Sequence, residues 1–449
     1  MSEDVTLKRR TDVVYLYQHA ARELDIACAV SALLSRHHGI HVEIAHWRTG
    51  VRQLLGVCQP KVVVLPFCYC KEDYALPLLA WRKAAFLNLA AEQLLSSATK
   101  KSKTPQDNFC RNHVVHQAWN PDFREFLASC NVPNENVFTN GNPTYMLLKE
   151  PYSRAAISRM ELSRFYNLRE DLPWLLFPEN YGWAFYSDEE LHSGPILRGM
   201  SREEAFGIRD YSQKSLKVAL EWCVRLASEK RIELILRPRP ATPNRYIEKE
   251  IQKQTVHFPK NLHIRREHSV RDWILASDFV MSSYSTTLVE AAVAAKPAAM
   301  LSPFPIPPFL LVSWNRLVNQ LHSYEMLEEF ILNSKEPVGL KAWAESELLS
   351  VEDPIQSLCQ KILAILKGVG GGQVLKRSDA ISGNRFGRNR FLLSLLFEYR
   401  RMRWRTRGWG ADLPVTEYAM DSSDLLGKQE IADRKMHWHS VLFEPNATV

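Results

Sequence analysis

The sequence predicts an α/β protein with two Rossmann-like domains that face each other across a cleft, followed by a C-terminal helical tail. The chain of 449 residues is long enough for two or three domains that each bury a core. Short apolar runs alternate with helix-length segments, which is typical of βαβ units and of a parallel sheet covered on both faces. A glycine-rich break at residues 368–372 precedes a change of composition. We therefore expect domains at 1–150 and 151–367 and a partly helical tail at 368–449.

The composition excludes several classes of protein. Hydrophobic residues make up 46% and charged residues 24%, which argues against a disordered, fibrous or multi-span membrane protein. Lys and Arg exceed Asp and Glu by 57 − 50 = 7, too few to mark a nucleic-acid binder. The eight cysteines have no framework spacing, the N-terminus shows no secretory leader, and no apolar run reaches the roughly 18 residues of a membrane-spanning helix. We expect a cytoplasmic protein with reduced thiols.

The first domain is predicted from runs rich in β-branched and aromatic residues, at 12–17, 41–47, 61–67, 84–90, 112–117 and 136–139. Apolar residues at helical spacing over 23–36, closed by Gly39, predict its first helix. Ligands of parallel sheets bind outside the carboxyl ends of the strands, so polar residues that follow strands are site candidates. These candidates are His19, Arg22 and Asp25 after the first strand, Glu92 after the fourth and Asn142 after the sixth.

Two nucleotide-binding motifs are missing from the sequence. No GxGxxG follows the first strand and no GxxxxGK[ST] occurs, which argues against NAD enzymes and P-loop NTPases. The polar, basic segment 96–108 either closes over a charged ligand or is a solvated loop, and both interpretations stay open. Cys110, His113 and His116 have the residue types of a metal site, but alternation along the predicted strand separates the two histidines. We expect no metal site.

The second domain repeats the βαβ pattern, with helical segments at 151–167 and 201–230 and strands at 174–178, 232–237, 262–265, 279–282 and 298–302. The strand 232–237 runs into the sequence Arg-Pro-Arg-Pro, in which the prolines take the chain out of the sheet and aim Arg237 and Arg239 at the crevice. Arginine binds phosphate in bidentate geometry, so both are phosphate-site candidates. We expect Arg237 to be the better placed, being nearer the strand; the alternative is an exposed strand end with solvated charges.

A hydroxyl-rich turn at 282–287 leads into a helix predicted at 288–295. Free amides and the positive end of the helix dipole favour anions there, and Ser285, Thr286 and Thr287 add donors. Capping alone explains one Ser or Thr, whereas five occur in six positions. Glu290, one turn into the helix, can accept hydrogen bonds from ribose hydroxyls. The turn therefore predicts recognition of phosphate or diphosphate.

These segments resemble a family of bacterial surface-carbohydrate (capsule and lipopolysaccharide) biosynthesis glycosyltransferases of the GT-B type, a family similar to Kdo transferases and CDP-glycerol glycerophosphotransferases. The resemblance covers about residues 12–330. It is carried by RELD at 22–25, by the acidic element at Glu92, by TNGNP at 139–143, by RPRP at 237–240 and by STT at 285–287 with Glu290. It implies a GT-B fold with two Rossmann-like domains.

The resemblance also implies a reaction. A sugar would pass from a nucleotide-activated donor, a CMP- or UDP-sugar, to a growing surface polysaccharide or a lipid-linked acceptor. No DxD-like motif ends a strand, so we expect metal independence, as in GT-B enzymes generally, and no cofactor besides the nucleotide-sugar substrate. Glycerophosphotransferase, sugar-nucleotide epimerase and a catalytically inactive GT-B scaffold remain alternatives.

The site roles that the resemblance implies fall into three groups. A carboxylate removes the acceptor proton, and cations and hydroxyls absorb the charge of the leaving group. The implied residues are Glu92 as general base with Asp25 as reserve, Arg237, Arg239, Ser285, Thr286 and Thr287 at the phosphates, Glu290 at the ribose, and His19, Arg22 and Asn142 on the acceptor side or in the cleft. Two positions depart from the family: Arg239 replaces the His of RPHP, and Glu92-Gln93 keeps one carboxylate of an acidic pair.

The tail is strongly basic. Eight arginines and one acidic residue fall between Arg385 and Arg407, around an apolar run at 391–397. Such a segment suits the inner face of an anionic plasma membrane, and it equally suits packing on the first domain. We do not expect nucleic acid as a partner, because no recognised binding module accompanies the charge.

Overall fold

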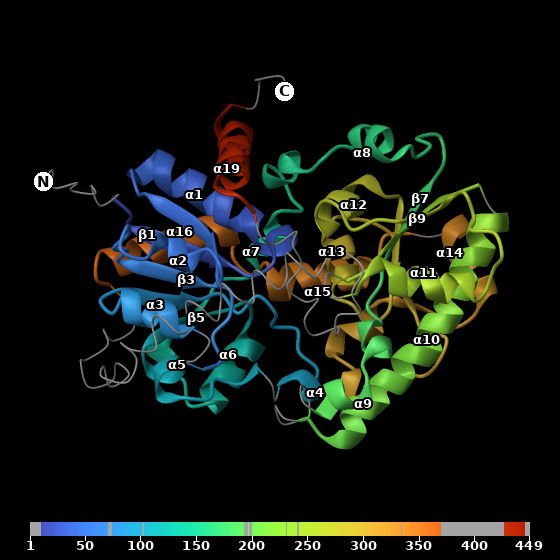
Figure 1. The fold of residues 1–449 in the computed structure, drawn as a ribbon, viewed down its shortest axis with the longest axis horizontal. Coiled ribbons are helices and arrows are strands. Elements are labelled where there is room, and N and C mark those ends of the chain that lie inside the picture. The colour runs from blue at the N-terminus through green and yellow to red at the C-terminus, as the bar shows by residue number, and fades with distance from the viewer. Residues whose placement is uncertain are drawn as a thin grey trace, which may run out of the picture.

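The computed structural model describes residues 10–70, 74–100, 103–192, 196, 200–229, 231–239, 242–333, 335–369 and 426–444. The chain forms two lobes that lie side by side (Figure 1). Each lobe holds one six-stranded sheet, and the neighbouring strands of both sheets pair in parallel. The two sheets confirm the predicted pair of Rossmann-like domains.

The first-lobe sheet has the strand order β2-β1-β3-β4-β5-β6. Its order reverses between β1 and β3, and a reversal of this kind leaves a crevice outside the carboxyl ends of the strands. Alternation sends Tyr15 to one face and Leu16 to the other. The strands are β1 (Val13–Tyr17), β2 (Val42–His46), β3 (Val62–Leu65), β4 (Ala85–Asn88), β5 (Val114–Ala118) and β6 (Val137–Thr139).

The second-lobe sheet has the strand order β12-β11-β10-β7-β8-β9. This order corresponds to the Rossmann arrangement 3-2-1-4-5-6, so its switch point lies between β7 and β10. Residues that directly follow these two strands are therefore placed to contact a ligand. The strands are β7 (Trp174–Pro178), β8 (Glu233–Arg237), β9 (Leu262–Ile264), β10 (Phe279–Ser282), β11 (Ala298–Leu301) and β12 (Asn319–Leu321).

Helices cover both faces of the first sheet. One face packs on α1 (Asp25–His38), and the other packs on α2 (Val51–Leu54), α3 (Ala75–Ala80) and α5 (Asn108–Asn112). The αL conformation of Gly39, with φ of 62°, ends α1 as the sequence predicts. The remaining helices of the lobe are α4 (Ser97–Lys100), α6 (Pro121–Ser129) and α7 (Pro143–Met146).

The second sheet also lies between two layers of helices. Its Leu175 face packs on α10 (Arg202–Glu229), α11 (Asn244–Gln252) and α14 (Tyr324–Asn333). Its Leu176 face packs on α8 (Arg159–Tyr166), α12 (Val270–Ala276), α13 (Thr287–Val293) and α15 (Val338–Leu348). The short α9 (Asp188–Leu191) lies near the start of α10.

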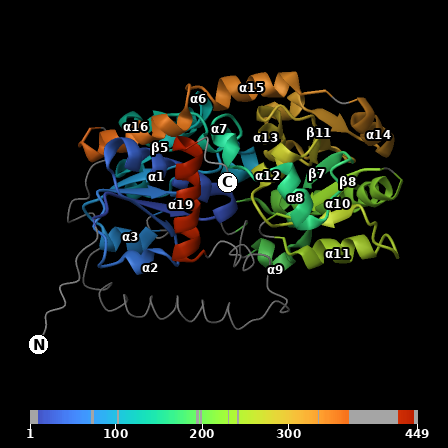
Figure 2. The same ribbon diagram turned by 90° about the horizontal axis from the view of Figure 1, so that it is seen from above.

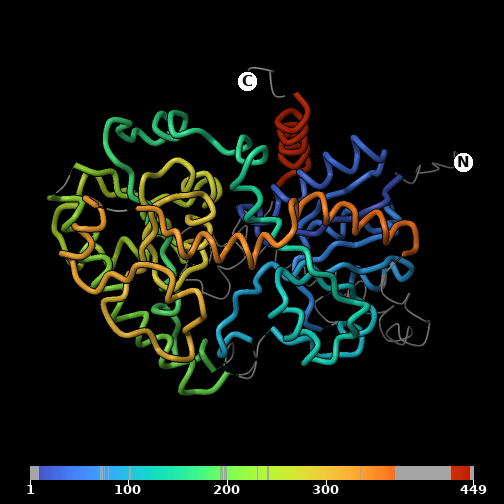
Figure 3. Tube along the Cα trace, turned by 180° about the vertical axis from the view of Figure 1, so that it is seen from behind, coloured from blue at the N-terminus to red at the C-terminus, as the bar shows by residue number. Residues whose placement is uncertain are grey.

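The chain returns to the first lobe after α15. Figure 3 shows the orange trace of this region running from one lobe to the other, and Figure 2 shows α16 (Pro354–Leu366) and α19 (Lys428–Phe443) against the first lobe. Ile355 of α16 and Trp438 of α19 are fully buried in the core that also contains α1. Thus the last helix of the predicted domain 151–367 packs on the first lobe. The segment Arg385–Arg407 lies outside the described residues.

Two polar contacts fix the return of the chain. Tyr152 donates its hydroxyl to Asp353 at 2.7 Å, and Lys149 pairs with Glu345 at 2.6 Å. In addition, the backbone N–H of Asn142 donates to the carbonyl of Leu348 at 2.6 Å.

The described helices include none that is long and apolar enough to cross a membrane.

Candidate active site between the lobes

Residues that follow strands in both lobes come together between the lobes. In the first lobe, β1 is followed by the short helix η1 (Ala20–Leu24), which carries Arg22. In the second lobe, β10 leads into α13, which carries Glu290. The charge of Arg22 acts on Glu290, and Tyr145 of α7 lies beside both Glu290 and Thr286. The structure therefore brings together Arg22, Thr286 and Glu290, which the sequence analysis predicted as site residues on separate segments.

Arg22 is held in a fixed direction by two carboxylates. Its Nε and Nη2 donate to Oε1 of Glu23 at 3.0 and 2.7 Å, and its Nη1 donates to Oε1 of Glu92 at 2.8 Å. The buried Glu23 also accepts the backbone N–H groups of Gln18 at 2.6 Å and His19 at 3.4 Å. The first-lobe candidates His19, Arg22 and Glu92 thus belong to one hydrogen-bonded network after β1 and β4.

Glu92 lies on the solvent side of this network, with half of its side chain exposed. It also forms an ion pair with Lys103. Lys103 belongs to the segment 96–108, whose helix α4 reaches the second lobe, where Ser97 Oγ donates to the carbonyl of Phe309 at 3.3 Å. An accessible carboxylate therefore lies where the two lobes meet, with cations on both sides of it.

Glu290 has an unusual electrostatic environment. Burial raises the pKa of Glu290 to about 7, and the positive charges of Arg22 and Arg271 oppose that rise. Burial also raises the pKa of the neighbouring Tyr145, so this hydroxyl stays protonated. A carboxyl group that titrates near neutrality beside a charge partner is typical of functional sites. Near pH 7 Glu290 can both donate and accept hydrogen bonds.

A second cluster lies at the switch point of the second lobe. Glu179 directly follows β7, is buried, and accepts the backbone N–H groups of Tyr181 and Arg239. Burial raises the pKa of Glu179, and the charge of Arg239 opposes the rise. A Cβ atom at Gly182 would crowd Oγ1 of Thr242 at 3.0 Å and touch Nη1 of Arg239 at 3.4 Å, so glycine leaves space beside Thr242. The sequence analysis overlooked Glu179, although its position directly after a strand was a usable signal.

The hydroxyl-rich turn forms part of the same edge. Thr287 Oγ1 donates to Ser285 Oγ at 2.9 Å, and Ser282 Oγ donates to the carbonyl of Pro178 at 2.5 Å. Within the described part of the chain, the fully buried Oγ of Ser283 has no hydrogen-bond partner. The predicted helix starts one residue early, at Thr287, with seven residues in α13. Two of the three predicted hydroxyls therefore bond to each other, while Thr286 faces Tyr145.

Arg237 is used differently from the sequence-based expectation. Its Nη1 and Nη2 donate to the backbone carbonyls of Glu267 and His268 at 2.8 and 2.5 Å. Burial lowers the pKa of Arg237 to about 10, and the negative charge of Asp272 opposes the fall. The loop before α12 thus takes up this guanidinium group. Arg237 therefore binds two backbone carbonyls, whereas the sequence analysis expected it to face a phosphate.

Asp25 also lies apart from the network of Glu92. Its buried carboxylate accepts Arg271 Nη2 of α12 at 2.7 Å, Arg434 Nε of α19 at 2.8 Å and Trp438 Nε1 at 2.8 Å. Burial by itself would raise the pKa of Asp25, but the charges of Arg271 and Arg434 outweigh it and hold the pKa well below its ordinary range. These donors occupy both oxygens of the carboxylate, so Asp25 has no lone pair free to act as the reserve base. Asp25 instead joins α1 to α12 and α19.

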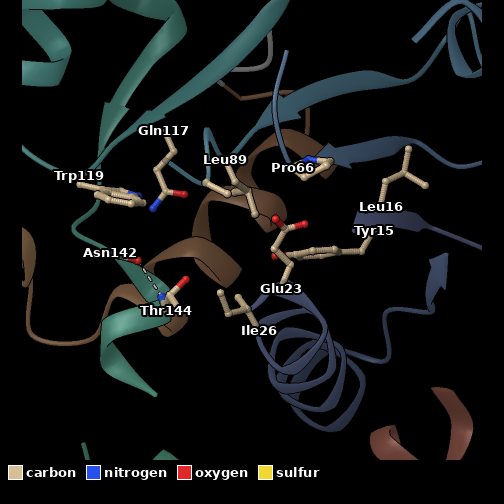
Figure 4. Close-up of a pocket in the computed structure, with 11 residues that line it drawn as sticks. Tyr15, Leu16, Glu23, Ile26, Pro66, Leu89, Gln117, Trp119, Asn142 and Thr144 are labelled. Atoms are coloured by element: carbon tan, nitrogen blue, oxygen red, sulfur yellow. Dashed lines mark hydrogen bonds between the residues drawn. The ribbon is translucent and has the colours of Figure 1, made fainter. Parts of the chain in front are cut away.

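Asn142 lines a pocket in the first lobe, outside the carboxyl ends of β1, β3, β4 and β5 (Figure 4). The pocket measures about 340 Å³ when its open mouth is included. The sequence analysis found Asn142 but missed most of the other polar lining. The lining residues are Tyr15, Leu16, Glu23, Ile26, Pro66, Leu89, Ala91, Gln117, Trp119, Asn142 and Thr144.

The Cys and His residues near β5 have partners within the protein. Cys110 Sγ lies 3.0 Å from Cys68 Sγ, and Nε2 of His116 lies 2.7 Å from the carbonyl oxygen of Cys110. Burial lowers the pKa of His116 to about 4, so the ring is neutral. Across the described ranges, no group of three or more His, Cys, Asp or Glu side chains is arranged to hold a metal ion.

Comparisons with known proteins support the fold. No protein-family model matches the sequence, and no curated protein matches it. The S. aureus MnaA co-structure with UDP matches at 12% identity and a TM-score of 0.50, covering 81% of this chain and 99% of that one. The UDP-GlcNAc 2-epimerase of Neisseria meningitidis bound to UDP-GlcNAc matches at 13% identity and a TM-score of 0.50, covering 80% of this chain and 100% of that one. The wall teichoic acid polymerase TagF matches at 10% identity and a TM-score of 0.52, covering 80% of this chain and 89% of that one.

At these identities the likeness concerns the arrangement of the chain and does not transfer an activity. The matches extend over nearly the full length of the MnaA and Neisseria meningitidis structures, and therefore over both lobes. Together with two parallel six-stranded sheets and helices that return to the first lobe, they show that this chain has the GT-B fold of these neighbours.

Proposed function

We propose that this protein is a glycosyltransferase that moves a sugar from a nucleotide-activated donor to a surface polysaccharide or a lipid-linked acceptor. The observation that carries the proposal is the meeting of Arg22 and Glu92 from one lobe with Glu290 from the other. A reaction between two substrates held by separate lobes needs functional groups from both at one place. The fold of the structural neighbours supports a nucleotide sugar as the donor class.

The donor belongs on the second lobe in this proposal. Arg239, beside the switch point, neutralises the phosphates, and Ser285, Thr286 and Thr287 supply hydroxyl donors. Glu290 receives the ribose hydroxyls, and its pKa of about 7 allows it to accept or donate a hydrogen bond there. Arg237 acts indirectly, by holding the loop before α12. A UDP- or CMP-sugar is the donor class to test first.

The acceptor belongs on the first lobe. Glu92 is the accessible carboxylate and serves as the general base that removes the proton of the acceptor hydroxyl. Its partners Arg22 and Lys103 hold it in place until the acceptor arrives, when the hydroxyl replaces one of these contacts. The departing nucleotide phosphate is then stabilised by Arg239. In this proposal, side chains of the protein fill both the role of the base and the role of stabilising the leaving group.

The fate of a labelled donor tests the proposal. Labelled UDP-GlcNAc, CMP-sialic acid and CDP-glycerol, incubated with the purified full chain and a bacterial membrane extract, separate the candidate reactions. Label transferred to the extract as a sugar supports a glycosyltransferase, whereas transfer as glycerol phosphate or conversion to a free epimeric nucleotide sugar supports the alternatives. A protein that binds no nucleotide would match the inactive scaffold.

A variant then tests the role of Glu92. Glu92→Gln keeps the shape of the side chain but removes the base, so kcat should fall by about 10² to 10⁴ with little change in nucleotide affinity. Glu125→Gln, an exposed substitution on α6 of the same lobe, is the control. Unchanged turnover in Glu92→Gln contradicts the assigned role.

A further inference from the structure

The pocket outside β1, β3, β4 and β5 contains buried polar atoms that lack partners. Tyr15 Oη, Gln117 Oε1 and Asn142 Nδ2 make no hydrogen bond to any described residue, although each of these residues is at most 1% exposed. More than nine in ten buried polar groups of native proteins are paired, and leaving one unpaired costs about 1–3 kcal/mol. Three such atoms around one pocket therefore point to a polar group that enters it.

The orientations of the two amides are fixed by their other contacts. Gln117 Nε2 donates to the carbonyl of Gly141 at 2.8 Å, which directs Oε1 into the pocket as an acceptor. Asn142 Oδ1 accepts the backbone N–H of Thr144 at 2.9 Å, which leaves Nδ2 as a donor. Reversing either amide would place two donors or two acceptors against each other. Figure 4 shows Gln117 and Tyr15 extending toward the pocket from opposite sides.

The lining offers both donors and acceptors but lacks a cation. Asn142 Nδ2 donates, Gln117 Oε1 accepts, and the Tyr15 hydroxyl can do either. Among the lining residues that the structure describes, Glu23 carries the one charge, and its oxygens already accept Arg22 and two backbone N–H groups. A phosphate or carboxylate would meet Gln117 Oε1 and Glu23 as repelling acceptors. A hydroxyl group matches the lining because it donates and accepts at once.

The other walls and the size of the pocket narrow the class of ligand further. Ile26, Pro66, Leu89 and Trp119 supply apolar and aromatic surface beside the polar atoms. The pocket is narrow inside, with room for about one group the size of a water molecule or a hydroxyl, and its mouth is open to solvent. Apolar surface next to paired donors and acceptors suits a sugar ring, which has C–H faces and hydroxyl edges. A hydroxyl of one sugar unit can therefore enter the pocket while the ring lies at its open mouth.

We propose that this first-lobe pocket is a subsite for an uncharged, hydroxyl-bearing sugar unit, recognised by Tyr15, Gln117 and Asn142. The inference deepens the proposed function and rests on it, because it names the chemical class of the acceptor end that approaches Glu92. Glu23 links the two places, since it lines the pocket and also holds Arg22, the partner of Glu92. The inference assigns acceptor specificity to Tyr15 of β1, Gln117 of β5 and Asn142 at the start of α7, away from the nucleotide side of the site.

Saturation-transfer NMR on the full chain tests the inference. The probes are methyl glycosides of glucose, galactose and N-acetylglucosamine, with glucuronate and inorganic phosphate as charged counterparts. We expect at least one methyl glycoside to bind, and to bind more tightly than either anion. Tyr15→Phe, which removes one hydroxyl, and Asn142→Asp, which keeps the oxygen that accepts Thr144 N–H but removes the donor, should each weaken that binding at least fivefold.

Tyr74→Phe is the matched control, since it removes a hydroxyl from a buried tyrosine of the same lobe that does not line the pocket. Urea unfolding verifies that every variant is folded. The inference is overturned if no glycoside binds, if the anions bind more tightly, or if Tyr74→Phe weakens binding as much as Tyr15→Phe. A thermal-shift measurement with UDP and CDP on the same samples reports separately on the proposed function, because these nucleotides address the second lobe.

Discussion

Arg434 donates its Nε to Oδ1 of Asp25 at 2.8 Å across 409 residues of sequence. The same carboxylate accepts Arg271 from the second lobe and Trp438 from α19. One buried group therefore joins the start of α1, the helix α12 and the last described helix. Because α1 follows directly on η1, the joint also supports the position of Arg22 in the candidate active site.

Removal of the Asp25 charge should destabilise the protein strongly. Asp25→Asn leaves Arg271 and Arg434 without their buried counter-charge, and breaking a buried pair from one side costs about 3–5 kcal/mol. Urea unfolding measures the loss. Glu150→Gln disrupts an exposed pair with Arg154 and should cost less than about 0.5 kcal/mol. Equal, small losses in both variants would show that Asp25 is not a structural joint.

Docking of α19 should depend on Trp438. The indole is fully buried against α1 and donates to Asp25, so Trp438→Ala should lower the free energy of unfolding by about 3–5 kcal/mol. Met436 lies on the same helix with 60% of its surface exposed, and Met436→Ala should change that energy by less than about 0.5 kcal/mol. Thermal unfolding of both variants checks this contrast. A stable Trp438→Ala protein would mean that α19 contributes little to the fold.

The two arginines of the RPRP segment should separate into different roles. Arg237→Ala leaves the carbonyls of Glu267 and His268 without their donors and should cost about 2–4 kcal/mol of stability. Arg239→Ala should cost under about 1 kcal/mol but weaken binding of UDP or CDP at least tenfold, because charge-assisted contacts to phosphate contribute about 1.5–3 kcal/mol each. Urea unfolding and calorimetry measure the two quantities. Equal nucleotide loss without destabilisation in both variants would contradict this division.

The stability of the protein should depend on pH through Glu290. Its pKa is about 7 in the folded protein against an ordinary value of 4.5, so the unfolded chain releases this proton first as pH rises. The stabilisation is complete below pH 4.5 and is lost as pH rises through 7. Relative to Glu290→Gln, the wild type should therefore lose on the order of 2–3 kcal/mol between pH 4.5 and 7.5.

Urea unfolding of the wild type and Glu290→Gln across this range measures the effect, with Glu125→Gln as the exposed control. Parallel curves for the wild type and Glu290→Gln would contradict the raised pKa. A wild type that gains stability relative to Glu290→Gln as pH rises from 4.5 to 7.5 would contradict the sign of the argument.

Most of the fold could be predicted from the sequence because its strands are short, apolar and separated by helical segments. The central strands VVYLY, VVVL and ELILR are nearly all buried, so their pattern is strong. The edge strand β12, with the sequence NQL, carries no such pattern and was missed. The helix α19 confirms the predicted helical tail, but its bounds could not be predicted, because its apolar residues are few and interspersed with polar residues that pair with the first lobe.

The candidate site was harder to predict, because a strand end fixes where a residue lies but not where its side chain points. The guanidinium of Arg237 turns to carbonyls 30 and 31 residues later, and Asp25 meets partners 246 and 409 residues away. Local spacing contains no information about such partners. Arg22 and Glu92 were found because each lies shortly after a predicted strand. The same rule, applied to β7, would have found Glu179.

The central claim is that the interlobe site binds a nucleotide on its second-lobe side. Thermal-shift measurement of the wild type and Arg239→Ala with CMP, CDP, UDP and GDP tests it most directly. We expect at least one nucleotide to stabilise the wild type, by about 2.7 kcal/mol at a hundredfold excess over its Kd, and to do so far less in Arg239→Ala. Stabilisation of neither protein by any of the four, or of both proteins equally, would contradict the account.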